Sequence, residues 1–516
     1  MALLGSIATV GSYTMLSRIL GFARDILIAA MLGAGPVADA FFVAFKLPNF
    51  FRRLFAEGAF NAAFIPLFTA RLTEDGHDVA RRFAEEVFAV LVVTLLLLCT
   101  AIQIAMPWAM HVFAPGFVGD PERFDLTVEL TRITFPYLLF ISLVSQLGGI
   151  LNSLGRFAAA AATPILLNVS LIAAIVALTP VLETAGHALA WGVFAAGVIQ
   201  FLWLIEACRR AGMTFRLPRP RINERVKRLL ILILPGAIGA GVVQINLLIG
   251  IVIASLLPTG SVSYLYYADR IYQLPLGVIG VAVGTALLPL LSRQLRAGEE
   301  ADAMASLNRA LEFALFLSLP AAAALVVMPG PIVSVLFERG AFDAQAARAT
   351  AEALIAFSIG VPAYVLVKVL APGFFAREDT ATPVKIAALC VALNIGLSVA
   401  LMGPLLHVGI ALAQAISSWV NAILLAVFLR RGGHLTFDRR LRERLPRVCL
   451  ASAGMAAALF AGAAALAPML DGGTAARGAA LTVLVVGGLA VYGGLALAVR
   501  AATIADIRLA MRRQRA

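Results

Sequence analysis

Long apolar runs recur along the whole chain, and they restrict the folds open to it more than any other feature. About fourteen windows of roughly 20 residues are apolar enough to cross the ~30 Å hydrocarbon core of a bilayer. Of the 516 residues, 61% are hydrophobic and 14% are charged, and the mean hydropathy is +0.93. This balance excludes soluble globular and disordered chains. The sequence therefore predicts an all-α polytopic membrane protein with about 14 transmembrane helices.

Basic residues are concentrated in alternate connections between the apolar runs. Residues 209–228 contain eight Lys or Arg and residues 430–447 contain seven, whereas the connections near 180–186 and 404–406 contain none. Because cytoplasmic loops carry the excess of basic residues, both termini are expected in the cytoplasm. We therefore attribute the net charge of +12 to basic loops that set the orientation of the chain in the membrane. An anionic-lipid or nucleic-acid patch at residues 209–228 is the functional alternative.

The chain repeats itself at an offset of 223 residues. AAFIPLFTARL at 62–72 resembles TALLPLLSRQL at 285–295, and GHALA at 186–190 resembles GIALA at 409–413. We expect a six-helix N-terminal lobe over 1–220, a six-helix C-terminal lobe over 221–440, and two additional helices with a tail over 441–516. The lobes are expected to share orientation and to enclose a central cavity, as in transporters with parallel repeats.

The first apolar run carries charge where lipid disfavours it. Arg18, Arg24 and Asp25 lie there together with Ser17 and Gly21. One ionised side chain at the bilayer centre costs about 3 kcal/mol on insertion scales. A helix-end arginine that reaches the interface is the ordinary explanation, but it does not suit both arginines and Asp25 together. This helix is therefore expected to face a hydrated cavity.

The second apolar run has the same character. Asp39, Lys46 and Arg53 lie at heptad spacing on one helix face. Pro48 is expected to kink the helix. Arg52 is placed in the cavity, and the role of Arg53 is left unassigned.

Further charges in this run and in the second half complete the candidate set. Asp269 and Arg270 lie in the eighth run, and Arg270 is the strongest candidate to face the arginines of the first lobe. Asp25, Asp39 and Asp269 would offset part of the positive charge. Glu57 and Lys368 join Lys46 and Pro48 as gate or hinge candidates.

An arginine cluster indicates the class of ligand. Guanidinium groups match phosphate oxygens in bidentate fashion, so arginines favour a phosphate or pyrophosphate head group. Structural pairing inside the helix bundle is the alternative. The sequence suggests no metal site and no cofactor, and it has no nucleotide-binding motif. An integral-membrane enzyme that uses arginines would also need clustered carboxylates for a metal ion or a general base; we find no such cluster, so no enzymatic activity is expected.

Four segments carry a resemblance to a known family: SRILGFARD, DAFFVAFKLPNFFRRLFAEGAF, SYLYYADRI and VKVLAPGFFARED. They resemble the MurJ (MviN) family of lipid II flippases, within the multidrug/oligosaccharidyl-lipid/polysaccharide exporter superfamily, over essentially the whole chain. The resemblance implies two six-helix lobes around a cavity, with the last two helices forming a groove for a polyprenyl tail. It also implies that Ser17, Arg18, Arg24, Arg52 and Arg270 bind substrate, with Asp25 and Asp39 as charged partners.

The same resemblance implies alternating-access transport of lipid II, the undecaprenyl-pyrophosphoryl disaccharide-pentapeptide, to the outer leaflet of the bacterial inner membrane. Such transport would serve peptidoglycan synthesis and cell shape. The implied partners are membrane lipids and cell-wall synthesis proteins. Some relatives are thought to bind sodium through acidic residues in the seventh and eleventh spans. Here those spans offer Gln244, Asn246 and Asn394 instead, which leaves the coupling cation open. A flippase for another polyprenyl-linked glycan, or a lipid-binding scaffold without transport, are the alternatives.

Overall fold

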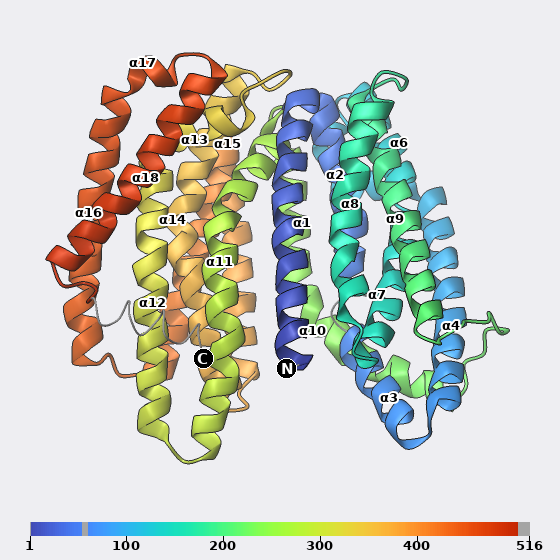
Figure 1. Ribbon diagram of the computed structural model, residues 1–516. Helices are drawn as coiled ribbons and strands as arrows, with labels where there is room; N and C mark the ends of the chain where they lie inside the picture. Colours follow the sequence, from blue (N-terminus) through green and yellow to red (C-terminus); the bar gives the residue numbers. More distant parts are fainter. Residues whose placement is uncertain (1, 54–59, 504–516) are drawn as a thin grey trace. The chain divides into compact units, whose positions relative to one another are not determined.

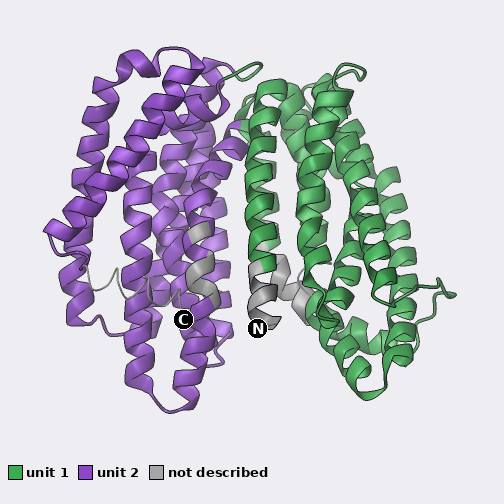
Figure 2. Cartoon of the chain, viewed as in Figure 1, with its two compact units in different colours: residues 1–263, 339–342 green, residues 264–338, 343–516 purple. Residues whose placement is uncertain are grey.

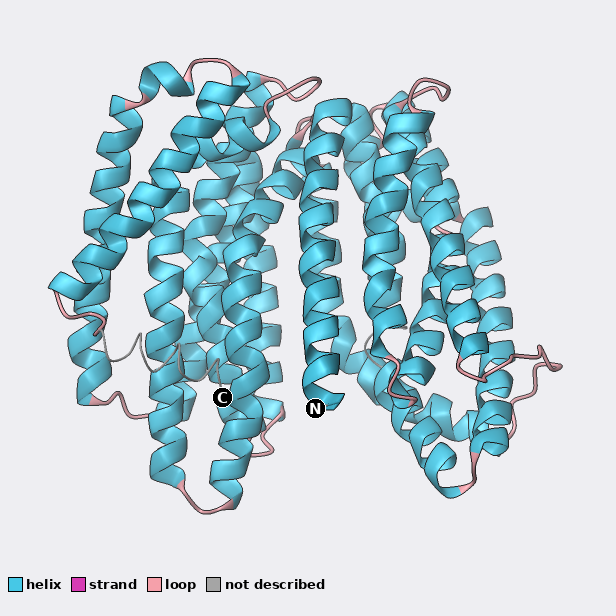
Figure 3. Ribbon diagram, in the orientation of Figure 1, coloured by secondary structure: helices cyan, strands magenta, loops and turns pink. Residues whose placement is uncertain are grey.

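The computed structural model describes residues 2–53 and 60–503. Every regular element in this part of the chain is a helix (Figure 3). The described residues thus confirm the all-α class, and Figure 1 labels the helices.

The chain forms two compact units, coloured separately in Figure 2: residues 1–263 with 339–342, and residues 264–338 with 343–516. The helices of unit 1 are α1 (Ala2–Leu32), α2 (Pro36–Phe51), α3 (Asn61–Glu74), α4 (His77–Ile104), α5 (Met106–Phe113), the short 3-10 helix η2 (Pro115–Phe117), α6 (Pro121–Thr134), α7 (Tyr137–Ser153), α8 (Phe157–Leu178), α9 (Ala185–Arg210) and α10 (Glu224–Ser255).

Helix α11 (Ser261–Arg296) begins in unit 1 and continues into unit 2. The remaining helices of unit 2 are α12 (Glu300–Val327), α13 (Pro329–Phe337), α14 (Ala344–Phe375), α15 (Ala381–Arg431), α16 (Arg439–Ala465), α17 (Ala467–Leu470) and α18 (Thr474–Ala498). Helix α15 contains two helical stretches joined at Leu406, whose backbone is not helical. Leu406 lies in the connection near 404–406 that the sequence places between two apolar runs, so each stretch corresponds to one run.

Helix starts are fixed by short polar side chains. Asp120, Thr184, Asn223, Asp343 and Asp438 each accept a hydrogen bond from the backbone N–H three residues ahead. Such caps satisfy donors that have no partner within the helix.

The internal repeat is also visible in the backbone. Asp120 and Asp343, 223 residues apart, both cap a helix, and Gly155 and Glu378, again 223 apart, both have positive φ after a helix. The similarity therefore extends from sequence letters to helix ends. The lobe boundaries drawn at residues 220 and 440 stay a prediction, because compactness and sequence similarity are different criteria.

Within unit 1, α8 packs against both α1 and α9, α7 packs against α9, and α2 packs against α6. In unit 2, α14 packs against α12 and α15, while α16 packs against α12 and α18. Tyr492 of α18 donates its hydroxyl to the backbone oxygen of Phe316 of α12 at 2.6 Å, so the last two helices are joined to the unit 2 bundle.

Nine helical segments of the described chain are long and apolar enough to cross a membrane. They are α4, the α6–α7 pair, α8, α9, α12, α14, α15, α16 and α18. The protein is thus a multi-pass membrane protein, and the figure of about 14 spans stays a prediction.

Candidate functional site

The charges predicted on the first apolar run lie on α1 and are drawn into a network with α8. The Arg24 guanidinium donates to Asp25 Oδ1 from Nε at 3.0 Å and from Nη2 at 2.7 Å. Its Nη1 donates to Asn168 Oδ1 at 2.9 Å, and Asn168 Nδ2 donates to the backbone oxygen of Ser17 at 2.9 Å. Arg24 and Asp25 are 7% and 3% exposed. The network holds a guanidinium and a carboxylate inside the bundle by mutual pairing.

Asn168 was not among the residues singled out from sequence. The sequence could have indicated its role, because an amide side chain within the apolar run 157–178 needs a hydrogen-bond partner inside the membrane. The two helices lie close together at Gly21 of α1, where a Cβ would lie 3.4 Å from Asn168 Nδ2. Arg18, by contrast, is exposed on α1.

Asp39 lies in a second, fully buried cluster at the start of α2. Its carboxylate accepts from Arg123 Nη2 at 2.5 Å, from the backbone N–H groups of Gly260 at 2.7 Å and Ser263 at 2.9 Å, and from Ser263 Oγ at 2.6 Å. The Arg123 guanidinium stacks 3.6 Å from the centroid of the Phe117 ring. Asp39 thereby caps the N-terminus of α11 while it pairs with α6.

Arg123 is the partner that the sequence reasoning missed. A cation in the first turn of a helix interacts unfavourably with the helix dipole. Arg123 lies three residues after the cap Asp120, and this unusual position could have indicated that it pairs with a carboxylate. The structure places Asp39 with this arginine, and it places Arg24 with Asp25 and Asn168.

Arg52 follows the end of α2 and borders a cavity inside unit 1. Its Nε donates to Asn49 Oδ1 at 3.1 Å. The cavity has a volume of about 410 Å³. Pro48 is buried within α2 and Lys46 is half-buried, whereas Glu57 lies outside the described residues.

The candidates of unit 2 lie on α11 and α14. The Arg270 guanidinium lies 4.6 Å from the centroid of the Tyr266 ring, and Asp269 accepts a hydrogen bond from Gln273 one turn later. The side chain of Lys368 crosses Gly280, where a Cβ would lie 2.8 Å from Lys368 Cδ. Glycine at this position of α11 thus leaves room for the lysine of α14.

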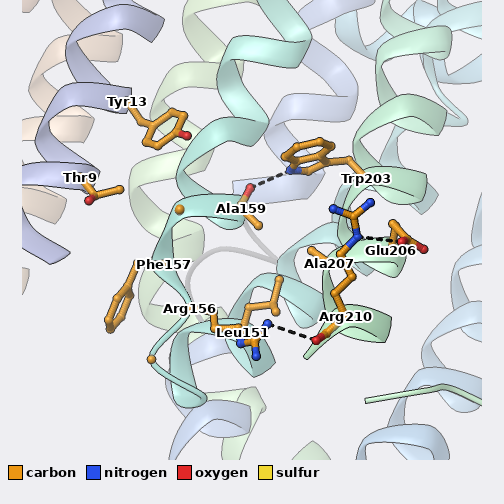
Figure 4. Close-up of a pocket in the computed structure, with 12 residues that line it drawn as sticks. Thr9, Tyr13, Leu151, Arg156, Phe157, Ala159, Trp203, Glu206, Ala207 and Arg210 are labelled. Carbon is orange, nitrogen blue, oxygen red and sulfur yellow. Dashed lines mark hydrogen bonds and ion pairs between the residues drawn. The ribbon is translucent and has the colours of Figure 1, made fainter. Parts of the chain in front are cut away.

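A second pocket of unit 1, about 670 Å³ in volume, is drawn in Figure 4. Trp203 donates its indole N–H to the backbone oxygen of Ala159 at 3.1 Å. Arg156 donates to the backbone oxygen of Arg210, and Arg210 pairs with Glu206. The arginines of this pocket are engaged by helix ends and by a neighbouring carboxylate.

Within the described residues, no group of three or more His, Cys, Asp or Glu side chains is arranged to hold a metal ion.

Comparison with known proteins places the chain in a family. The family model described as lipid II flippase MurJ matches residues 28–470. A probable lipid II flippase MurJ of Rhizobium meliloti (strain 1021) is 48% identical, over 99% of this chain and 97% of the relative. Its counterpart in Rhizobium tropici is 46% identical, over 100% of this chain and 98% of the relative.

Solved structures agree in fold. A lipid II flippase MurJ in an inward closed conformation matches with a TM-score of 0.79 at 25% identity, over 94% of this chain and 97% of that chain. An inward-facing MATE family transporter of the MOP superfamily matches with a TM-score of 0.65 at 16% identity, over 83% of this chain and 98% of that chain, which is a likeness of fold alone. From its sequence relatives and its fold together, the chain belongs to the lipid II flippase MurJ family.

Proposed function

We propose that this protein flips lipid II from the cytoplasmic to the outer leaflet by alternating access. Family membership over nearly the whole chain supports the substrate. The observation that carries the transport role is the ionised pair Arg24–Asp25 on α1, which is nearly closed to solvent yet lies in a membrane protein. Ionised groups at such positions mark substrate pathways.

The pyrophosphate of the substrate binds arginine in this proposal. Arg18, Arg24, Arg52 and Arg270 supply the guanidinium groups, and planar forks of this kind bind phosphate oxygens in bidentate fashion. Ser17 assists beside Arg24, which lies seven positions later and therefore on the same helix face.

Carboxylates moderate the positive charge. Asp25, Asp39 and Asp269 take this role in the proposal. The contacts of Asp25 with Arg24 and of Asp39 with Arg123 support it, because each carboxylate offsets a buried guanidinium.

Movement between the access states is assigned to four positions, namely Lys46, Pro48, Glu57 and Lys368. The interior proline of α2 supports a bending role, because proline removes one backbone hydrogen bond of the helix. The contact of Lys368 with Gly280 supports a role for α14 and α11 in unit 2.

The remaining parts of the proposal concern setting and energy. Both termini lie in the cytoplasm, the protein acts in the inner membrane beside cell-wall synthesis proteins, and it catalyses no covalent reaction.

An inside-negative potential favours outward movement of an anion by about 2.3 kcal/mol per charge per 100 mV. Transport then requires no bound cofactor, and a coupling cation is left open.

The test measures outward exposure of the lipid II head group in cells depleted of their native flippase. The parent chain should restore exposure, and Arg18→Ala, Arg24→Ala, Arg52→Ala and Arg270→Ala should lose it at equal membrane levels. Arg296→Ala is the matched control, because Arg296 is exposed at the end of α11 and bonds only within its own helix in the contacts described. A well-expressed parent that restores nothing would point to another polyprenyl-linked glycan or to a scaffold.

A further inference from the structure

We propose that the polar cavity inside unit 1 is a subsite for the sugar rings of the head group, next to the pyrophosphate held by Arg52. The inference rests on the proposed function and deepens it. Polar groups reach the cavity from four helices and from the end of α2, namely Arg52, Asn61, Ser145, Asn152, Thr163 and Gln200.

The cavity has the size of a ligand site and is shaped by small residues. Its volume of about 410 Å³ falls in the range of ~300–1,000 Å³ for small-molecule pockets. Gly148 and Gly149 of α7 and Ala160 of α8 line it. Short side chains at these positions keep open a space that larger residues would fill.

Gln200 of α9 supplies the observation that points to a ligand. The residue is 2% exposed. Its Nε2 donates to the backbone oxygen of Thr163 at 2.7 Å, while its Oε1 is buried without a hydrogen-bond partner. Buried polar atoms in native proteins are nearly always paired. Gln200 lines the cavity, so in this proposal a ligand in the cavity donates a hydrogen bond to this oxygen after a small movement of the side chain, because the oxygen is closed to solvent in the structure.

Asn61 repeats this arrangement at another wall. Its Nδ2 donates to Ser145 Oγ at 2.9 Å, and its Oδ1 is buried without a partner. Each of the two amides donates a hydrogen bond to the protein and has an oxygen without a protein partner. The complementary ligand is rich in O–H and N–H donors.

Charge selects among the parts of the head group. Among the described residues that line the cavity, Arg52 is the one ionised side chain and none is a carboxylate. A cation would find no partner among these residues. A peptide with several carboxylates would have only the Arg52 guanidinium to pair with, so most of its carboxylates would stay unpaired. Neutral N-acetylated sugars, attached to a pyrophosphate at Arg52, match the hydroxyl and amide donors that the cavity requires.

Gln200→Leu tests the subsite, since leucine is close in size and removes the unpaired oxygen. Gln146→Leu is the matched control. Gln146 of α7 is also fully buried, donates Nε2 to the backbone oxygen of Ala84 at 3.0 Å, and has an unpaired Oε1, but it does not line the cavity. A purely structural role of buried glutamine would affect both variants alike.

The measurement is the affinity of the full chain in nanodiscs for three lipids: lipid II, the same disaccharide lipid without its stem peptide, and undecaprenyl pyrophosphate. Gln200→Leu should weaken binding of both disaccharide lipids about 5- to 10-fold, the range for one lost hydrogen bond. Undecaprenyl pyrophosphate should bind within about twofold of the parent. Gln146→Leu should match the parent for all three lipids.

Equal weakening for all three lipids, or no change, would overturn the subsite and leave a water-filled cavity. A parent chain that binds lipid II no better than undecaprenyl pyrophosphate and fails to flip it would instead overturn the proposed function. Gly148→Ala is the second variant if Gln200→Leu does not fold. Its Cβ would meet Ala160 Cβ at 3.5 Å, an ordinary contact, and it should weaken the disaccharide lipids selectively by at least about twofold.

Discussion

The Asp39–Arg123 pair offers the sharpest test of what stabilises unit 1. Asp39 is 0% exposed and Arg123 is 5% exposed, so solvent screening hardly weakens their interaction. Removing one partner of a buried ion pair costs about 3–5 kcal/mol, because the other charge stays buried and unpaired. We expect Asp39→Ala to lower the free energy of unfolding by about 4 kcal/mol, since the carboxylate also accepts three hydrogen bonds at the start of α11.

Arg123→Met should cost less, about 2–3 kcal/mol, because Asp39 keeps its three bonds to α11. Once Asp39 is absent, the methionine removes an unpaired cation, and the double variant should be no less stable than Asp39→Ala alone. The coupling energy of the cycle should therefore reach about 2 kcal/mol or more.

Reversible unfolding in mixed detergent micelles, followed by circular dichroism, measures the four free energies. Single substitutions that add within about 0.5 kcal/mol would refute the reasoning, because independent sites behave in that way. Such a result would mean that the pair is neither closed to solvent nor coupled in the folded protein.

Three further substitutions test separate contacts. Gly340→Ala should lower the melting temperature by several degrees, because Gly340 has a φ of 59° and its Cβ would lie 2.2 Å from the backbone oxygen of Ala30; an unchanged melting temperature would contradict this close approach. Asn168→Leu should cost about 1–3 kcal/mol in unfolding free energy by removing the bond to Arg24, and a neutral effect would show that the network is not formed. Trp203→Phe should cost less than about 1 kcal/mol, because one bond at a partly exposed site is lost; a larger loss in the same unfolding assay would argue against an exposed site.

The fold class followed from sequence because its signal is local. Apolar runs of about 20 residues determine helices without reference to the rest of the chain. The cost of charge in lipid also predicted that Arg24 and Asp25 avoid the lipid. The expectation was that they face a hydrated cavity, whereas the structure pairs the two side chains in a nearly closed site.

The partners across the bundle did not follow in this way. Asp39 and Arg123 are separated by 84 positions, and Arg24 and Asn168 by 144, so helical periodicity carries no information about either pair. The role of Gln200 could not be predicted from sequence for a related reason. Its importance comes from an oxygen without a partner, which depends on how α7, α8 and α9 pack.

Helix α11 has a consequence for any motion of this protein. Residues 261–263 belong to unit 1 and the rest of the helix belongs to unit 2, so one continuous rod carries the chain from one unit to the other. The Asp39 carboxylate holds the first turn of that rod. Because the first turn is held in this way, bending of α11 has to occur further along the helix, and interior Pro275 permits it. A spin-label pair spanning Pro275 would detect such a bend as a change in label separation within α11.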